Sequence, residues 1–189
     1  GIQTETYPRF DPEPLIKQVD LNFRIRLKNR DVFIQVYKYE YLGESGHNVP
    51  IYFLDTDFDK NQENDKNITR RLYSGDKDHR ILQEAILGFG GIKLLQKLKQ
   101  NSIKTFHMNE GHCSFLVLGL LNQYNGDIEK VRSFCHFTTH TPVPAGHDQF
   151  SLKRVEDILG NMIPAKLKLP SIKNKKRLHM TELGLMYSR

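Results

Sequence analysis

The sequence predicts an α/β fold: a parallel sheet with helices on both faces, preceded by an antiparallel hairpin. Residues 19–27 and 32–39 alternate apolar and polar side chains across a short polar turn at 29–31, a pattern typical of a hairpin with one solvent-exposed face. From residue 79 onward, helical patterns alternate with short apolar runs. That alternation indicates parallel strands joined by right-handed helical crossovers.

Composition limits the class of protein. The chain has 189 residues, of which 38% are hydrophobic and 26% charged, as expected for one sizeable folded domain. The net charge is +6, but Lys and Arg are spread along the chain, so no nucleic-acid partner is predicted. The densest basic stretch, residues 166–177, is predicted to be a solvated loop rather than a polyanion site.

The cellular setting follows from what the sequence contains. It shows no signal peptide and no apolar run near the length of a bilayer crossing, so we expect a cytoplasmic protein with no membrane partner. Cys113 and Cys135 both lie in apolar neighbourhoods. They are predicted to be buried free thiols rather than a disulfide.

The first half of the chain is predicted in order as follows. Residues 1–16 form an irregular entry segment, and the hairpin follows. Residues 49–55 are a continuous apolar run ending in an acid, which predicts a buried strand, and residues 56–78 form a surface loop with one short helical piece.

A helix is predicted from 79 to 99, capped by Asp76 or Asp78. Gly88, Gly90 and Gly91 fall inside it, so the helix is either interrupted or packed closely at these points. We favour close packing against the sheet.

The second half alternates strands and helices. The predicted elements are a strand at 105–108, a helix at 110–123, a short helix at 128–133, a strand at 134–139 and a helix at 152–162. The last ten residues have the pattern of the first turns of a further helix, with Thr181 as its cap.

Two segments, 106–112 and 137–148, leave these apolar strands and become polar and rich in histidine. His112 and His140 lie 28 residues apart, about the length of one strand–helix–strand unit. Both tips would then meet at the carboxyl edge of a parallel sheet, where open α/β sheets bind ligands.

Each polar segment also has a structural interpretation. In the first, Asn109 could cap the next helix with Glu110 in its first turn, and His107 could be a hydrogen-bonded strand residue. The second could be a plain structural turn. A preorganised site is favoured in the second segment because a rigid loop bearing two prolines follows an apolar strand. Its polar candidates are Thr138, Thr139, His140, Thr141, His147 and Asp148.

Other chemistries fit less well. His107, His112, His140, His147 and Glu110 could supply metal ligands, but their spacing matches no helical or knuckle signature, so no metal site is predicted. Cys113 has the neighbours of an inward-facing thiol rather than of a nucleophile. Residues 88–91 are glycine-rich but lie within a helical pattern, so no phosphate loop is predicted.

The sequence resembles the α-glucan phosphorylases, in particular their shorter prokaryotic type. The resemblance covers nearly the whole chain and is carried in order by residues 49–56 (VPIYFLDT), 71–76 (RLYSGD), 80–84 (RILQE), 109–112 (NEGH) and 137–150 (FTTHTPVPAGHDQF).

The resemblance implies a fold and an activity. The family has two Rossmann-like domains facing each other across a cleft, the glycosyltransferase B arrangement, and this chain resembles part of the N-terminal one. These enzymes transfer a terminal α-1,4-linked glucosyl unit of a glucan to inorganic phosphate, giving glucose 1-phosphate with retention. The phosphate of pyridoxal phosphate acts as proton relay and is held by a lysine of the C-terminal domain, so no cofactor-binding residue is expected here. The parent protein could form a homo-oligomer.

The resemblance also implies residue roles. His140 matches the catalytic-site histidine that contacts the transferred glucose, and Glu110 and His112 match positions on the glucan side of the cleft. Asn109, Thr139 and Asp148 are further substrate-binding candidates from the same segments. Such groups supply hydrogen bonds to sugar hydroxyls and stabilise an oxocarbenium-like transition state.

The sequence departs from the family pattern at its start, where Ile2 stands in place of an aromatic residue, and it lacks the glycine-rich loop upstream and the cofactor lysine downstream. Residues 1–189 are therefore expected to be a partial N-terminal domain that is inactive alone. Two alternatives are a non-catalytic glucan-binding or structural remnant and another retaining glycosyltransferase of the same two-domain fold.

Overall fold

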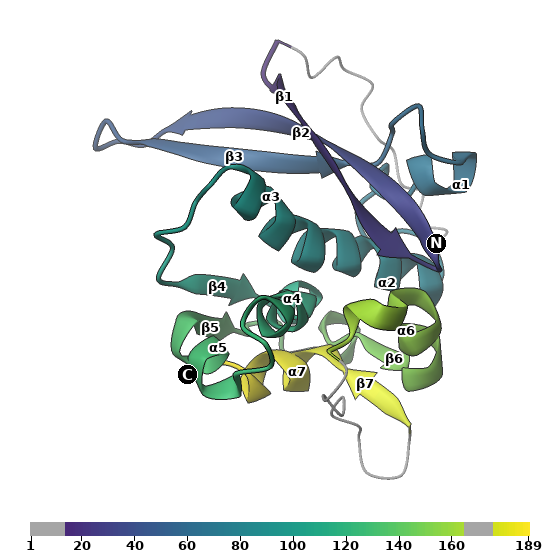
Figure 1. Ribbon diagram of the computed structural model, residues 1–189. Coiled ribbons are helices and arrows are strands. Elements are labelled where there is room, and N and C mark those ends of the chain that lie inside the picture. The colour runs from purple at the N-terminus through teal and green to yellow at the C-terminus, as the bar shows by residue number, and fades with distance from the viewer. Residues whose placement is uncertain (1–13, 165–175) are drawn as a thin grey trace, which may run out of the picture.

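The computed structural model describes residues 14–164 and 176–189 (Figure 1). The predicted entry segment, except residues 14–16, and the predicted basic loop, except residues 176–177, lie outside the described residues. The predicted α/β class is confirmed: three antiparallel strands come first, and from residue 106 onward strands and helices alternate.

The described elements form three sheets and the helices that pack against them. The strands are β1 (Lys17–Leu27), β2 (Arg30–Leu42), β3 (Asn48–Asp55), β4 (Phe106–Asn109), β5 (Cys135–Thr138), β6 (Gln149–Ser151) and β7 (Arg177–His179). The helical elements are α1 (Glu63–Lys66), α2 (Lys77–Ala85), η1 (Ile86–Gly90), α3 (Gly91–Lys97), η2 (Gly111–Cys113), α4 (Phe115–Gln123), α5 (Ile128–Phe134), η3 (Pro144–Gly146), α6 (Leu152–Leu159), η4 (Gly160–Met162) and α7 (Met180–Met186).

The predicted hairpin is the β1–β2 pair. Its turn lies at Lys28 and Asn29, one residue earlier than predicted, and both have positive φ angles, 48° and 59°. Positive φ at both central residues is the conformation that suits a two-residue hairpin turn. The alternating pattern buries one face, as expected, with Phe23, Ile25 and Leu27 of β1 and Val32, Ile34 and Val36 of β2.

The prediction of a buried strand at 49–55 is wrong in its burial. This segment is β3, the edge of an antiparallel sheet of order β1-β2-β3, and Val49, Ile51 and Phe53 are 52%, 40% and 47% exposed. Only the opposite face of β3 packs on the core, through Leu54 and Tyr52. Because both faces of this strand are apolar, the pattern alone did not show that one of them faces solvent.

The predicted long helix consists of α2, a π-helical turn (η1) and α3. Asp76 caps it as predicted: its Oδ1 accepts the backbone N–H of His79 at 2.9 Å. Gly88 lies in the π turn, and a Cβ built there would come within 2.6 Å of the Leu116 backbone nitrogen. The helix is thus both interrupted and closely packed. At Gly88 the close neighbour is α4, whereas at Gly90 it is the antiparallel sheet, as predicted, since a Cβ there would come within 3.1 Å of Leu54 Cδ1.

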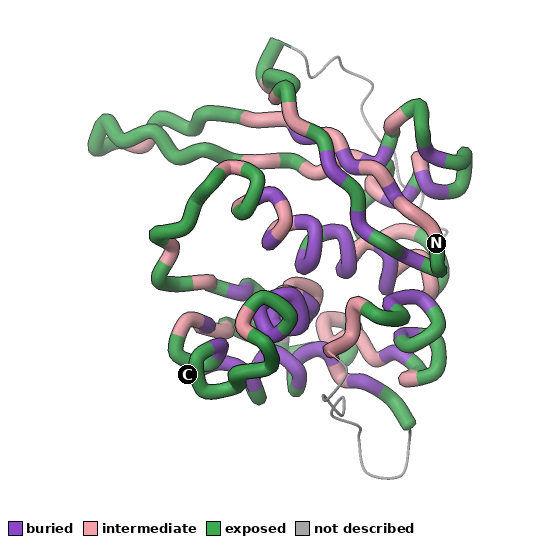
Figure 2. Tube along the Cα trace, in the orientation of Figure 1, coloured by how far each residue is buried: buried purple, intermediate pink, exposed green. Residues whose placement is uncertain are grey.

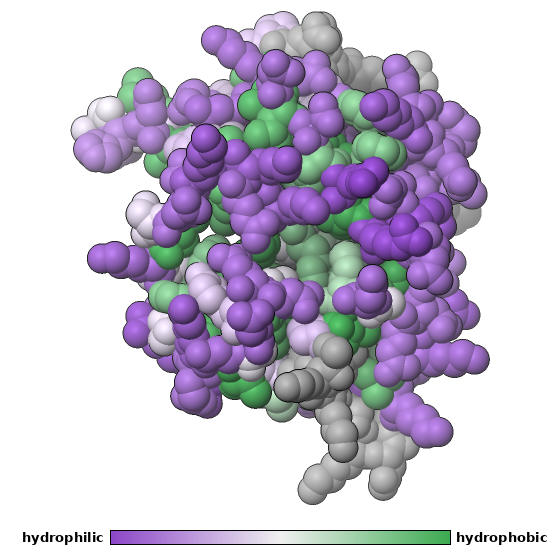
Figure 3. Space-filling model, in the orientation of Figure 1, coloured by the Kyte–Doolittle hydropathy of each residue, from purple (hydrophilic) through white to green (hydrophobic). Residues whose placement is uncertain are grey.

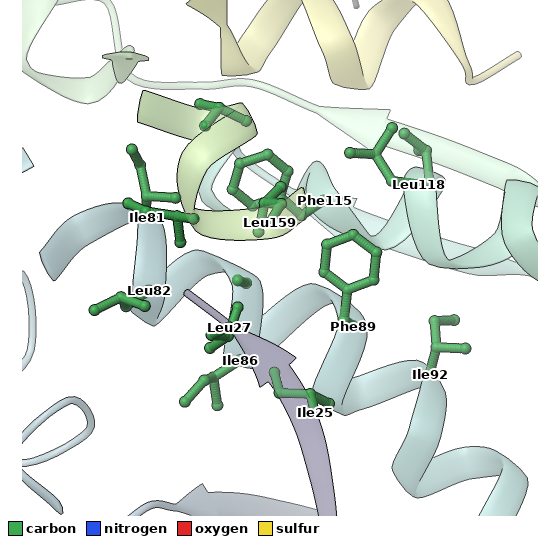
Figure 4. Packing of buried hydrophobic residues seen from close by; sticks show 14 of the residues in the cluster. Ile25, Leu27, Ile81, Leu82, Ile86, Phe89, Ile92, Phe115, Leu118 and Leu159 are labelled. Carbon is green, nitrogen blue, oxygen red and sulfur yellow. The ribbon is translucent and has the colours of Figure 1, made fainter. Parts of the chain in front are cut away.

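The core lies between the antiparallel sheet and the helices beneath it, where buried segments face one another (Figure 2). Figure 4 shows side chains from β1, from the α2–η1–α3 run, from α4 and from α6 converging there. Hydrophilic side chains cover most of the face in Figure 3, with apolar ones visible between them.

The parallel pair predicted from the two histidine-bearing segments is β4–β5. Its register runs from Phe106 opposite Cys135 to Asn109 opposite Thr138, so both strands end at the same edge. In the described residues the parallel sheet consists of this pair. Asn109 ends β4 and caps no helix, because Glu110 turns the chain at a positive φ of 71° and α4 begins only at Phe115.

The C-terminal part departs from prediction in two respects: the short strands β6 and β7 were not predicted, and Thr181 does not cap the last helix. The helix expected at 152–162 is present as α6 and η4, and α7 begins at Met180 after a short strand, β7. Thr181 is not the cap: it lies inside the first turn of α7, where its hydroxyl is 2.9 Å from His147 Nδ1.

The predicted free thiols are found, with Cys135 buried and Cys113 half-buried. Across the described ranges, every helix is too short or too polar to traverse a bilayer.

Candidate functional site

A pocket of about 690 Å³ opens at the carboxyl ends of β4 and β5. The turn before α2, the first turns of α2, the β4–α4 turn and the loop after β5 form its walls. Its lining residues are Tyr73, Gly75, Asp76, Lys77, Arg80, Asn109, Glu110, His112, His140, Thr141, Val143, Gly146 and Asp148.

Five of the six predicted site residues line this pocket: Asn109, Glu110, His112, His140 and Asp148. The sixth, Thr139, does not, and its hydroxyl instead donates to Glu110 Oε2 at 3.0 Å. The tips of β4 and β5 thus lie around one pocket, and the role of these residues as a site stays a prediction.

Glu110 is the most constrained of these residues. It is 5% exposed, and its backbone adopts φ 71° and ψ 168°, a conformation that non-glycine residues seldom take. Its Oε1 accepts the backbone N–H groups of His140 and Thr141, at 2.7 and 2.9 Å. The carboxylate therefore ties the β4 turn to the loop after β5.

These contacts set the charge state of Glu110. Burial opposes the ionised form, but the hydrogen bonds from His140, Thr141 and Thr139 outweigh it and lower the pKa from 4.5 to about 2. A carboxylate fixed in this way keeps a negative charge in the pocket wall at any pH well above 2.

His140 projects from the end of β5 with its side chain 61% exposed. Its Nδ1 lies 3.5 Å from Glu110 Oε1, and its Nε2 lies 3.3 Å from Asn109 Oδ1. The two contacts orient the imidazole, whose side chain remains largely exposed at the pocket.

His112 is more enclosed. Burial lowers its pKa, and the positive charge of Arg80 lowers it further, against the opposing effects of Glu110 and Asp148. A neutral imidazole has one N–H donor and one acceptor nitrogen, which suits a ligand hydroxyl. The ring meets Tyr73 edge to face, with centroids 6.2 Å apart.

Sequence reasoning missed the contribution of α2. Arg80 is 14% exposed at the pocket wall and its Nη2 donates to Asp148 Oδ2 at 2.8 Å. Its guanidinium also lies 5.1 Å from the centre of the Tyr73 ring. The family-like runs at 71–76 and 80–84 pointed to this region, but nothing in their spacing showed that they meet the two histidine segments.

Two histidines considered in the sequence lie away from the pocket lining. His107 Nε2 is 2.7 Å from Thr138 Oγ1, and His147 turns toward α7 and Thr181. Within the part of the chain that the structure describes, no group of three or more His, Cys, Asp or Glu side chains is placed to hold a metal ion.

The arrangement suits a ligand rich in hydroxyl groups. Fixed carboxylates accept hydrogen bonds, while Arg80 donates and neutral His112 can do both. Tyr73 is 61% exposed and offers an aromatic face beside them. A concave pocket with a few convergent polar groups is the usual form of a small-molecule site.

Comparisons with known proteins point in one direction. No protein-family model matches the chain. The chain is 35% identical to the glycogen phosphorylase of Mycobacterium tuberculosis over 82% of its length and 34% identical to the maltodextrin phosphorylase of Thermococcus litoralis over 86%. The matches cover 20% and 21% of those proteins, so the chain spans about a fifth of the length of these curated relatives.

Among solved structures, the catalytic domain of starch synthase IV from Arabidopsis thaliana, bound to ADP and acarbose, superposes with a TM-score of 0.64. The match covers 92% of this chain and 32% of that chain at 13% identity. At 13% identity the likeness shows the fold alone, and it confirms that the chain has the fold of part of a glycosyltransferase B domain, as predicted.

Proposed function

The chain is a sequence relative of the α-glucan phosphorylases over about a fifth of their length, and from that relationship we propose that it forms the sugar-binding wall of a phosphorylase active cleft. In this proposal, residues 1–189 are part of the N-terminal domain of a longer cytoplasmic enzyme. That enzyme transfers a terminal α-1,4-glucosyl unit of a glucan to inorganic phosphate and releases glucose 1-phosphate.

The observation that carries the proposal is the convergence of His140, His112 and Glu110 on one pocket at the carboxyl edge of β4 and β5. These three belong to the segments that resemble the family most specifically. Asp148 and Asn109 complete the same wall.

The geometry supports a separate role for each of these residues. Glu110 holds the loop that carries His140, and His140 Nε2 exchanges its 3.3 Å contact with Asn109 Oδ1 for a hydrogen bond to a hydroxyl of the glucosyl unit being transferred. His112 and Asp148 bind hydroxyls toward the glucan side. The negative charge of Glu110 favours positive charge developing at the anomeric carbon.

The pyridoxal phosphate that the family resemblance implies does not fit the described residues of this chain. Its attachment needs a lysine with a free amine, and the lysine in the pocket wall is Lys77. The Nζ of Lys77 donates to the Gln149 carbonyl oxygen at 3.0 Å and lies over the Phe150 ring. We therefore propose that the cofactor is bound by another part of the longer enzyme, and no step above involves it.

The first test is ligand binding by the chain itself. Titration with maltoheptaose, followed by NMR of histidine side chains, should shift His112 and His140 and leave His47, exposed in the β2–β3 turn, unchanged. His140→Ala should weaken binding at least tenfold, while the matched control His47→Ala should bind as the parent does. Equal binding by both variants would place the sugar elsewhere.

The second test separates a partial site from a complete enzyme. Incubation of the chain with maltodextrin, phosphate and pyridoxal phosphate should give no glucose 1-phosphate. Sustained turnover would show that the cleft is complete within these residues. Absence of any maltoheptaose binding would favour a structural role over glucan recognition.

A further inference from the structure

The loop from Thr139 to Asp148, which carries His140, is fixed at both ends. At its start, Glu110 accepts the N–H groups of His140 and Thr141. At its end, the Asp148 side chain accepts from Arg80 at 2.8 Å, and the Asp148 carbonyl oxygen accepts the N–H of Met180 at 3.0 Å. The position of Arg80 therefore affects how the pocket wall is held.

Arg80 is itself anchored by the helix that carries it. Its Nη1 donates to Gln83 Oε1 at 3.1 Å, and its Nη2, which bonds Asp148, also donates to Glu84 Oε1 at 2.9 Å. One guanidinium nitrogen thus joins two carboxyl groups, one from α2 and one from the loop after β5.

Glu84 is an unusual residue to find here. It is 1% exposed, it is not among the residues that line the polar pocket, and its second oxygen, Oε2, is buried with no hydrogen-bond partner in the described residues. Two ionised carboxyls beside one cation would leave a buried negative charge uncompensated, which is strongly unfavourable.

We propose that Glu84 is a positioning residue for the pocket: as a neutral acid it fixes Arg80, and through Arg80 it holds Asp148 and the end of the loop that carries His140. Asp148 then bears the single negative charge that balances Arg80. The consequence for ligand binding rests on the proposed function, but the positioning role does not.

The charges around Glu84 support this assignment. Arg80 and Lys77 face it from its own helix, Asp148 from the loop after β5, and the thiol of Cys113 from the turn after β4. Burial raises the pKa of Glu84 most, the charge of Asp148 raises it further, and Arg80 and Lys77 only partly oppose them, so it lies well above the usual 4.5.

The protonation state can be measured without a ligand. Carboxyl carbon NMR of the full chain across pH 3–8 should show Glu84 titrating well above the usual 4.5 of a glutamate carboxyl. Asp148→Asn should lower the Glu84 midpoint because it removes a neighbouring negative charge. A Glu84 that titrates near 4.5, or whose midpoint is unmoved by Asp148→Asn, would overturn the proposal.

The positioning role is tested by hydrogen exchange at the Met180 amide, which reports its bond to Asp148. Glu84→Gln, a neutral isostere, should leave the exchange rate within about twofold of the parent, whereas Glu84→Ala should raise it at least tenfold. Glu129→Ala serves as the surface control and should have no effect. If Glu84→Gln exchanges as fast as Glu84→Ala, or Glu84→Ala matches the parent, the proposal is overturned.

Maltoheptaose affinity supplies the functional readout. Glu84→Ala should weaken binding about fivefold and Glu84→Gln should leave it unchanged. If the parent chain binds no maltoheptaose, the proposed function fails, yet the carboxyl titration and the amide exchange still decide the role of Glu84.

Discussion

The backbone N–H of His140 donates to Glu110 Oε1 at 2.7 Å, which ties together the tips of two neighbouring parallel strands. The two residues come from segments 30 positions apart in the chain, and the carboxylate also accepts from Thr139 and Thr141. The orientation of the exposed His140 ring therefore depends on a carboxylate that is almost entirely buried.

This relationship predicts an acid-sensitive contribution to stability. The pKa of Glu110 falls from 4.5 in the unfolded chain to about 2 when folded, so its contribution is present above pH 4.5 and is lost as pH falls toward 2. At about 1.4 kcal/mol for each pKa unit, the loss approaches about 3 kcal/mol. Urea unfolding at pH 2, 3, 4, 5 and 6 measures it.

Glu110→Gln is the matched comparison for that experiment. The amide cannot ionise, so the variant should be less stable than the parent at pH 6 and should lose the part of the pH dependence below 4.5 that Glu110 causes. If the free energy of unfolding of the variant still fell below pH 4.5 as steeply as that of the parent, other carboxyls would be responsible for the acid sensitivity.

Thr139 gives a finer test of the same contact. Its hydroxyl donates to Glu110 Oε2 at 3.0 Å, so Thr139→Val should lower the free energy of unfolding by about 1 kcal/mol and raise the Glu110 pKa. Thr139→Ser keeps the hydroxyl and should behave as the parent. If valine and serine have equal effects on the titration of Glu110, the hydroxyl is not the relevant group.

Local patterns predicted much of this architecture. Strict alternation over 19–27 and 32–39 sufficed for the hairpin because one face of each strand is buried and the other solvated. The spacing of His112 and His140 was enough to predict that both lie at one edge of the sheet, because neighbouring parallel strands end at the same edge.

The remainder depended on contacts that no local pattern encodes. The apolar run at β3 is compatible with burial on both faces or on one, and only the position of β3 at a sheet edge decides between them. Arg80 and Glu84 lie in a plainly helical segment, and their part in the site arises because Asp148 approaches from 64 or more residues away.

The two glycines Gly88 and Gly91 should respond oppositely to the same substitution. At Gly88 a Cβ would lie 2.6 Å from the Leu116 nitrogen and 2.7 Å from the Phe115 carbonyl carbon, so Gly88→Ala should destabilise by about 2 kcal/mol. Gly91 lies in helical backbone, and a Cβ there would have no neighbour within 4 Å, so Gly91→Ala should stabilise the folded chain by about 1 kcal/mol. Urea unfolding of both variants checks this, and two changes of the same sign would contradict the packing of η1 on α4.

Cys113 lies next to the pocket but should be a poor nucleophile. Burial raises its pKa to about 11 and that of Cys135 to about 12, so little thiolate of either is present at pH 8. Iodoacetamide at pH 8 should modify the folded chain far more slowly than the chain in urea, with Cys113 reacting before the fully buried Cys135. Rapid and selective modification of Cys113 in the folded chain would instead indicate an activated thiol beside the pocket, and would bring back the nucleophilic role that its surroundings argue against.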